Sequence, residues 1–161
     1  MKILFICTHN RCRSILAEAI CNHYGEGELE AISAGSSPAG QVHPLTLQAL
    51  KAMGIPTESL SSQSLNVFEN ADIDYVITVC DKAANEPCPI WFSKSMQAHW
   101  GLKDPSSIEG DEETINAAFS NTITILQKRI KKIHNWIKQG LDKDELFKRI
   151  KALATEAYIQ E

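Results

Sequence analysis

The chain has 161 residues, of which 43% are hydrophobic and 22% charged, and its formal net charge is -4 at pH 7. This length suits a single domain with a buried core, and the composition is typical of a globular protein. The negative charge disfavours a nucleic-acid partner, and no apolar run reaches the roughly 20 residues of a membrane-spanning helix. We therefore expect neither nucleic acid nor a membrane as a partner.

The amino-terminal hexapeptide, Met-Lys-Ile-Leu-Phe-Ile, leads into polar residues without a small-residue cleavage site. It matches a secretory signal peptide poorly, so we expect a cytoplasmic protein. The chain has five cysteines, an odd number, at positions 7, 12, 21, 80 and 88. In such a compartment they are expected to be reactive or buried thiols rather than structural disulfides.

The first half of the chain alternates between strand and helix patterns. Lys2 to Ile6 is almost unbroken apolar sequence, which predicts a strand buried on both faces of a parallel sheet. The following patterns predict, in order, a helix over residues 14–24 that ends at Gly25, a strand over Leu29 to Ala34, a turn-rich loop over Gly35 to Gly40, a helix over Leu45 to Met53 that stops at Gly54, and a short helix over Val67 to Asn70.

The second half continues the alternation. Tyr75 to Val79 is the clearest β-branched run and predicts a central strand, which ends in Cys80 and a polar loop through Cys88. The remaining patterns predict a short last strand over His99 to Leu102, a long amphipathic helix over Thr114 to Lys138, and a last helix from Lys143 to about Ala154. Strands that alternate with helices predict an α/β fold with a parallel sheet.

Reactive side chains follow three of the predicted strands. Cys7 to Ser14 follows the first strand, Cys80 follows the Tyr75 strand and Asp104 follows the last. Ligands of open α/β sheets bind at the carboxyl ends of the strands. We therefore expect a nucleophile, a second thiol and a carboxylate to meet at one edge of the sheet.

Residues 7–14, Cys-Thr-His-Asn-Arg-Cys-Arg-Ser, connect the first strand to the first helix. The amides of such a loop and the helix dipole can hold an anion and stabilise a thiolate on Cys7. Arg13 offers a planar fork for two oxygens, Ser14 can donate to the Cys7 sulfur, and Asn10 tolerates a left-handed backbone. Cys7 alone would suit a buried apolar thiol, but the C-x5-R-S spacing favours a nucleophile in an anion-binding loop. The substrate-binding residues expected here are Thr8, His9, Asn10, Arg11, Cys12 and Arg13.

Asp104 is a candidate general acid. A neutral carboxylic acid can protonate the leaving oxygen of a tetrahedral oxyanion, and Pro105 restricts Asp104 to extended conformations. Without the cysteine loop, an ordinary Asp-Pro turn would be the better interpretation.

Together, the loop residues and the distant Asp104-Pro105 pair resemble the low-molecular-weight protein tyrosine phosphatase fold family, and within it the thiol-dependent arsenate reductases. The resemblance spans roughly residues 1–135 and implies a four-stranded parallel sheet flanked by helices. It also implies Cys7 as nucleophile, Arg13 with the loop amides as oxyanion cradle, Ser14 as thiolate stabiliser and Asp104 as general acid. His9 stands where the family usually has glycine. We expect a domain of this type over residues 1–138 and an extra C-terminal helical extension over 139–161.

Cys80 and Cys88 help to distinguish an arsenate reductase from a phosphatase within this family. A phosphatase has no need of them, whereas reduction of arsenate consumes two electrons. The resemblance implies that Cys7 attacks arsenate, that Cys80 attacks Cys7 and releases arsenite, and that Cys88 attacks Cys80. The resulting Cys80–Cys88 disulfide then passes to an external reductant, either thioredoxin or glutathione with glutaredoxin. The alternatives are a core thiol at the strand end for Cys80 and an idle loop thiol for Cys88.

Two other functions stay open at this point. One is a phosphatase that acts through a Cys7 phosphoenzyme, although Ser106-Ser107 follows Asp104-Pro105 where phosphatases usually have an aromatic residue. The other is a non-catalytic regulator that binds an oxyanion or a metal. In any arsenate-binding protein, we expect phosphate or sulfate to act as mimics of arsenate.

The remaining candidates are minor. Cys12 either forms a protective disulfide with Cys7 or fills space, and Cys21 is expected to pack in the core. No zinc-ligand spacing is present, so we expect no metal site. We also expect no tightly bound cofactor and a monomeric protein. One exception is a potassium ion beneath the loop, as in some relatives, whose site Asn10, Glu18 and Ser33 match in part.

Overall fold

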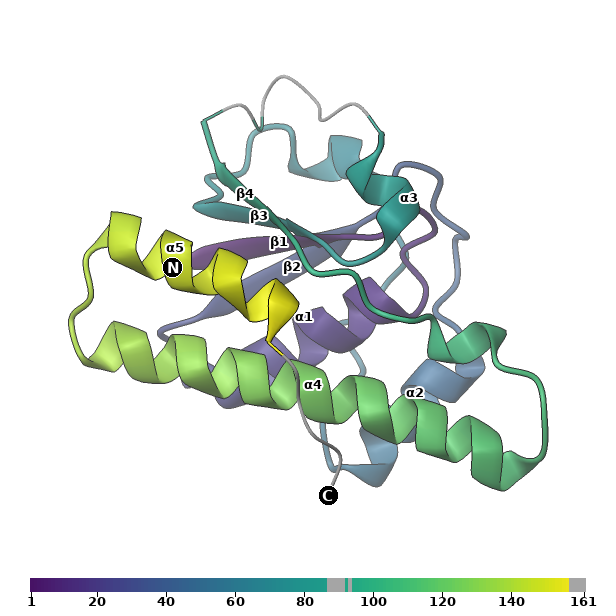
Figure 1. Ribbon diagram of the computed structural model, residues 1–161. Coiled ribbons are helices and arrows are strands. Elements are labelled where there is room, and N and C mark those ends of the chain that lie inside the picture. Colours follow the sequence, from purple (N-terminus) through teal and green to yellow (C-terminus); the bar gives the residue numbers. More distant parts are fainter. Residues whose placement is uncertain (87–91, 93, 157–161) are drawn as a thin grey trace.

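The computed structural model describes residues 1–86, 92 and 94–156 of the chain. A sheet of four parallel strands lies at its centre, in the order β2-β1-β3-β4 (Figure 1). The strands are β1 (Lys2–Ile6), β2 (Glu30–Ala34), β3 (Tyr75–Thr78) and β4 (Met96–His99). The expected α/β fold with a four-stranded parallel sheet is confirmed.

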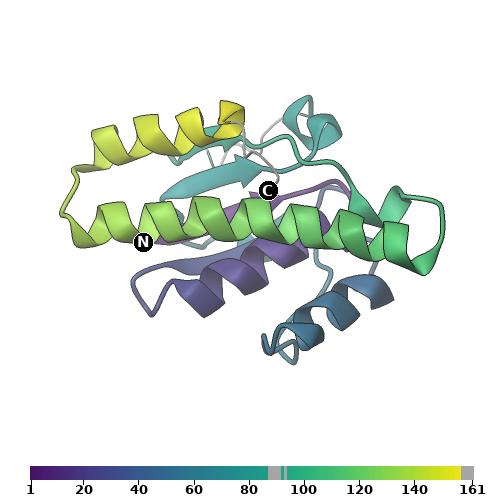
Figure 2. The ribbon, with the colours of Figure 1, turned by 60° about the horizontal axis from the view of Figure 1, so that its bottom comes forward.

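Helices cover the sheet and connect its strands. They are α1 (Arg13–Tyr24), α2 (Pro44–Ala52), the single turn α3 (Asp81–Ala84), α4 (Glu112–Lys138) and α5 (Lys143–Ala152), with short 3-10 helices η1 (Leu65–Phe68), η3 (Pro105–Ser107) and η4 (Leu153–Thr155). Figures 1 and 2 show α1 and α4 on one side of the sheet, and α3 lies on the other. Among the helices of the described residues, none is long and apolar enough to cross a membrane.

Burial on both faces explains the apolar sequence of the central strands. In β1, Ile3, Leu4 and Phe5 are fully buried, and Ile77 of β3 is too. Such strands lie inside a parallel sheet, where neither face reaches water. Because β1 and β3 are buried and paired in register, the core determines where along the sheet they end and where the residues after them lie.

The helix α5 packs against β4 and α4. It buries Leu146 and Ile150, and the backbone carbonyl of Ile150 accepts a hydrogen bond of 3.0 Å from the indole Nε1 of Trp100. The ring of Phe147 stacks on that of Tyr75. The C-terminal segment therefore adds to the same core, and the boundary expected at residue 138 stays a prediction.

Three local predictions need correction. The last strand is Met96–His99 rather than His99 to Leu102, because its register is set by β3, where Tyr75 pairs with Met96 and Thr78 with His99. The polar loop after Cys80 begins with the helix α3, and the short helix expected over residues 67–70 is the 3-10 turn η1.

Candidate active site

Cys7 and Cys80 lie side by side at the carboxyl edge of the sheet. They follow β1 and β3, which are neighbours in the sheet, and Ile6 pairs with Thr78 just before them. The two thiols are close enough to influence each other's pKa, and both are buried, with 5% of Cys7 and 2% of Cys80 exposed. The expected meeting of two thiols at one edge of the sheet is therefore present.

The two thiols shift each other's pKa in opposite directions. Cys7 is the chief cause that lowers the pKa of Cys80 to about 5, and the amide of Ala83 and the hydroxyl of Thr8 act in the same direction, against burial, which raises it. Cys80 and burial raise the pKa of Cys7, against the opposing effects of Arg13 and the His9 amide. The directions of these shifts favour ionisation of one thiol of the pair over ionisation of both.

The loop of residues 7–13 is held from outside by the segment that follows β2. Three of its carbonyl groups accept hydrogen bonds from that segment. The bonds run from Ser37 to Thr8, from Ala39 to His9 and from His43 to Arg11, each at 2.9 Å. Because the N–H of a peptide group points away from its C=O, the amides that follow these carbonyls face the inside of the loop. This is the arrangement that cradles an anion.

Gly35 permits this close approach. A Cβ atom at this position would lie 2.5 Å from the carbonyl oxygen of Thr8 and 2.8 Å from that of Cys7. Any larger residue would push the supporting segment away from the loop.

Asn10 holds the middle of the loop. Its φ is 46°, in the left-handed region predicted for it, and its side chain is fully buried. Its Nδ2 donates to the hydroxyls of Ser14 at 2.8 Å and Ser33 at 2.9 Å, and its Oδ1 accepts from the amide of Gln63 at 2.8 Å. Because Ser14 accepts from Asn10, its own hydroxyl hydrogen can be donated elsewhere. Donation to the Cys7 sulfur stays a prediction.

Arg13 joins the loop to the segment after β4. Its NH1 donates to the carbonyl of Leu102 at 3.0 Å, and its NH2 lies 3.6 Å from Oδ2 of Asp104. Its Nε is buried and has no hydrogen-bond partner among the described residues. A buried guanidinium N–H without a partner is costly, and an oxyanion in the loop would satisfy it.

Asp104 reaches the loop as expected, with a side chain that is 25% exposed. It caps η3, and its Oδ1 accepts from the amide of Ser106 at 3.0 Å and from the Ser106 hydroxyl at 2.6 Å. The carboxyl group is thus oriented by Ser106, which was expected only to stand, together with Ser107, where phosphatases usually have an aromatic residue.

Thr8 has contacts that sequence reasoning missed. Its hydroxyl lies 3.6 Å from the Cys80 sulfur and 3.4 Å from Oε1 of Glu86, and it can donate its single hydrogen to only one of them at a time. Thr8 was expected only to bind the anion, and Glu86 was not singled out. A hydroxyl beside the nucleophile is the one signal that could have suggested this contact.

The other expected site residues differ in their surroundings. His9 is exposed, and its Nδ1 lies 3.2 Å from the carbonyl of Ser37. Cys12 is buried, and burial raises the pKa of its thiol to about 11. Cys88 lies outside the described residues.

Glu18 and Ser33 lie together beneath the loop. Glu18 is only 8% exposed, and burial raises its pKa to about 7, against hydrogen bonds from Ser33. Asn10 turns its NH2 group toward Ser33, so its amide oxygen points away from that side. Glu18 and Ser33 offer oxygen atoms of the kind that potassium binds, whereas Asn10 in this orientation does not, and the potassium ion itself stays a prediction.

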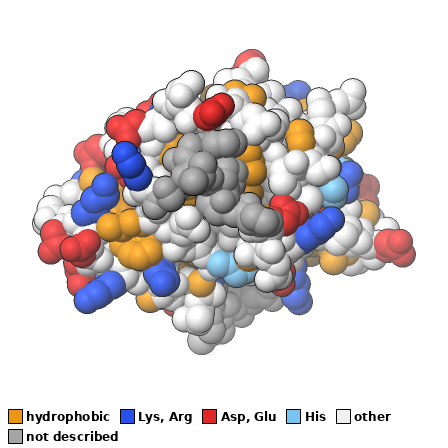
Figure 3. Space-filling model, turned by 90° about the horizontal axis from the view of Figure 1, so that it is seen from above, with side chains coloured by type: hydrophobic (Ala, Val, Ile, Leu, Met, Phe, Trp, Pro, Cys, Tyr) orange, Lys and Arg blue, Asp and Glu red, His pale blue; other side chains and the backbone are white. Residues whose placement is uncertain are grey.

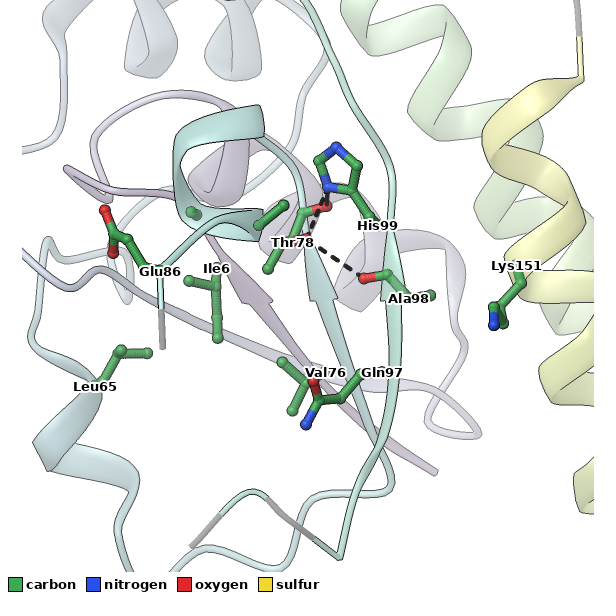
Figure 4. A pocket seen from close by; sticks show the side chains of 11 residues that line it. Ile6, Leu65, Val76, Thr78, Glu86, Gln97, Ala98, His99 and Lys151 are labelled. Atoms are coloured by element: carbon green, nitrogen blue, oxygen red, sulfur yellow. Dashed lines mark hydrogen bonds between the residues drawn. The ribbon is translucent and has the colours of Figure 1, made fainter. Parts of the chain in front are cut away.

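A pocket of about 330 Å³ lies on the α3 side of the sheet, next to this edge (Figure 4). Its described lining includes Val76, Thr78 and His99, whose Nδ1 lies 2.8 Å from the Thr78 hydroxyl, but neither Cys7 nor Arg13. Figure 3, which looks down on the molecule from above Figure 1, shows acidic and basic side chains spread over this face. Because the described lining of the pocket includes neither Cys7 nor Arg13, we assign the expected thiol reaction to the loop and not to the pocket.

Known proteins resemble this chain over most of its length. The model of the family "Low molecular weight phosphotyrosine protein phosphatase" matches residues 2–146. An arsenate reductase of Shouchella clausii is 34% identical over 130 residues, which are 81% of this chain and 92% of that protein. A glutaredoxin arsenate reductase of Synechocystis is 32% identical over 104 residues, 65% of this chain and 78% of that one. The structure of a thioredoxin-dependent arsenate reductase of Corynebacterium glutamicum matches with a TM-score of 0.65 and 29% identity, over 87% of this chain and 63% of that one.

Proposed function

The chain belongs to the low-molecular-weight phosphotyrosine protein phosphatase family, and we propose that it is an arsenate reductase, which converts arsenate to arsenite with electrons from its own thiols. The relatives that are named arsenate reductases support this activity, and they cover most of the chain.

The adjacent, buried pair of Cys7 and Cys80 supports the proposal most directly. A phosphatase needs one thiol, which forms a phosphoenzyme that water hydrolyses. A second, ionised thiol against the nucleophile would be of no use in that reaction. It is what a thiol–disulfide exchange requires, because the attacking thiolate must reach the sulfur that it attacks.

In the first step the Cys7 thiolate attacks arsenate in the loop. An S–As bond forms, one As–O bond breaks, and the leaving oxygen takes a proton from Asp104 and departs as water. A proton of the thiol pair moves to Cys80 when Cys7 reacts as a thiolate. Arg13 and the loop amides hold the remaining oxygens, and arsenic stays in its +5 state.

In the second step Cys80, once ionised, attacks the sulfur of Cys7. The new S–S bond forms as the S–As bond breaks, and its electron pair goes to arsenic, which is released as arsenite in the +3 state. Two thiols have then supplied the two electrons. The Thr8 hydroxyl and the Ala83 amide stabilise the Cys80 thiolate that this step requires.

In the third step Cys88 attacks Cys80, and Cys7 leaves as a thiolate. An external dithiol then reduces the Cys80–Cys88 disulfide. Relatives linked to thioredoxin and to glutaredoxin both resemble this chain, so each system is a candidate reductant. Phosphate and sulfate, which share the tetrahedral shape of arsenate, would compete for the loop.

The decisive experiment follows NADPH consumption that depends on arsenate, with the thioredoxin and the glutathione–glutaredoxin systems in parallel. The wild type should be active with at least one of them, and Cys7→Ser, Cys80→Ser and Cys88→Ser should each abolish turnover. Cys21→Ser is the matched control, because Cys21 is buried in α1, away from the thiol pair. One turnover without reductant should consume two thiols.

Other outcomes would contradict the proposal. Full arsenate reduction by Cys80→Ser would eliminate the relay. Hydrolysis of p-nitrophenyl phosphate without any reduction of arsenate would make the chain a phosphatase. A cellular function that survives Cys7→Ser would indicate a regulator that binds the anion without catalysis.

A further inference from the structure

The two carboxyl oxygens of Asp104 have different surroundings. Oδ1 accepts two hydrogen bonds from Ser106, one from its amide at 3.0 Å and one from its hydroxyl at 2.6 Å. Oδ2 faces Arg13, with 3.6 Å to NH2. The carboxyl group therefore has one oxygen held by its own turn and one that faces the anion loop.

This difference decides which oxygen can carry a proton. A protonated carboxyl group has one O–H donor and one carbonyl acceptor. If the proton were on Oδ1, it would meet two donors that already point at that oxygen. The carbonyl form of Oδ1 keeps both hydrogen bonds, so the proton belongs on Oδ2, which is on the side of Arg13 and the loop.

The direction of the Ser106 hydroxyl is also fixed. Asp104 Oδ1 can only accept, so the hydroxyl hydrogen of Ser106 points at it. Ser106 is itself half-buried, whereas the next residue, Ser107, is exposed. The hydroxyl of Ser107 donates instead to the backbone carbonyl of Asp104, at 2.8 Å.

We propose that Ser106 is a positioning residue for the acid step: it holds Oδ1 of Asp104 and so directs the transferable proton to Oδ2. This inference rests on the proposed reduction of arsenate. In the step, the proton leaves Oδ2 for the departing oxygen, the As–O bond breaks with release of water, and Asp104 becomes a carboxylate. Ser106 neither gains nor loses a proton.

The test compares two neighbouring serines. Ser106→Ala should lower kcat for arsenate about tenfold, a typical share of a general-acid contribution, while KM changes less than about twofold. Ser107→Ala, the matched control, should keep both constants within about twofold of the wild type, because its hydroxyl does not touch the carboxyl group. Ser106→Thr, which retains the hydroxyl, should restore most of the lost activity.

Two further measurements separate positioning from a general structural effect. In an Asp104→Asn background, Ser106→Ala should cause no additional loss, because both changes remove the same function. With aryl phosphates as substrates, Ser106→Ala should slow the cleavage of phenyl phosphate more than that of p-nitrophenyl phosphate. The better leaving group needs less help from an acid.

These readouts also keep the two proposals apart. If the wild type cleaves aryl phosphates but does not reduce arsenate, the proposed function fails. The role of Ser106 is then tested by the rates of aryl phosphate cleavage alone. If Asp104→Asn is impaired while Ser106→Ala behaves like Ser107→Ala on arsenate, the role of Ser106 is overturned and the reductase stands. An equal loss with both aryl phosphates, or no rescue by Ser106→Thr, would also overturn it.

Discussion

Cys80 lies beside Cys7 because β1 and β3 end at the same level of the sheet. The pairing of Ile6 with Thr78 sets this level, and each chain segment then presents a cysteine at the carboxyl edge. Each thiol shifts the pKa of the other, and the pKa of Cys80 is the one that is lowered. For the proposed relay, the attacking sulfur therefore needs no large movement to reach Cys7.

The proximity of the two thiols predicts a change in the titration of Cys80. Its pKa is lowered to about 5, chiefly by Cys7, so Cys7→Ala should raise it by more than about one unit. The ultraviolet absorbance of the thiolate, measured as a function of pH, should show this shift when compared with the same variant carrying Cys80→Ser. Cys21→Ala should leave the titration unchanged. An unaltered midpoint in Cys7→Ala would mean that Cys7 does not lower the pKa of Cys80.

The Thr8 hydroxyl should matter for the second step rather than for binding. It lies 3.6 Å from the Cys80 sulfur and helps to lower the pKa of that thiol. Thr8→Val should therefore reduce kcat for arsenate reduction about tenfold, with a smaller change in KM, whereas Thr8→Ser should remain close to the wild type. Single-turnover reactions that are stopped at successive times should show that the Cys7–arsenic adduct accumulates in Thr8→Val. A change in KM with an unchanged kcat would mean that Thr8 acts only in binding the anion.

The helix α5 should stabilise the whole domain. Ile150 is fully buried where α5 meets the sheet, so Ile150→Ala should lower the free energy of unfolding by about 2–5 kcal/mol. Lys148→Ala, on the exposed side of the same helix, should change it by less than about 0.5 kcal/mol. Denaturant unfolding followed by tryptophan fluorescence measures both. Equal stability of the two variants would mean that residues 1–138 fold without help from α5.

The parts of the structure that the sequence predicted are those where one local signal is strong. The apolar runs of β1 and β3 could hardly form anything but buried strands. Asn10 was expected to adopt a left-handed backbone, which it does at φ 46°, because few other residues accept it in a tight loop. The specific C-x5-R spacing likewise located the loop that holds Cys7 and Arg13, and Asp104 lies 3.6 Å from Arg13 as expected; their catalytic roles stay predictions.

The parts that were missed depend on tertiary contacts. The last strand was placed three residues too late, because Met96 and Gln97 have little intrinsic strand preference and pair only through β3. The helix α3 was missed because its cap is the sulfur of Cys80, which accepts from the Ala83 amide at 3.4 Å, and cysteine is not a usual capping residue. The contacts of Thr8 and Ser106 join distant segments or depend on a turn geometry that no motif encodes.

Glu18 should make the stability of the protein depend on pH. Burial raises its pKa from 4.5 to about 7, so the folded state binds this proton more tightly than the unfolded state. Its contribution is therefore present below pH 4.5 and is lost as the pH rises through about 7, a change of roughly 3 kcal/mol. Glu18→Gln should remove this dependence and raise the Tm at about pH 8. An identical pH profile of Tm in both proteins would contradict it.

The same carboxyl group tests the proposed potassium ion. An ion that binds the Glu18 carboxylate would stabilise the folded state and offset the cost of burying the charge, since binding to the native state alone raises stability. Potassium chloride should then raise the Tm at about pH 8 more than choline chloride of equal ionic strength does. The difference should vanish in Glu18→Gln, and it should shrink at about pH 5, where the carboxyl group is protonated. Ser33→Ala should weaken the potassium effect as well, because Ser33 is the other oxygen donor on that side of the loop. Equal effects of both salts on the wild type would contradict a potassium ion at Glu18.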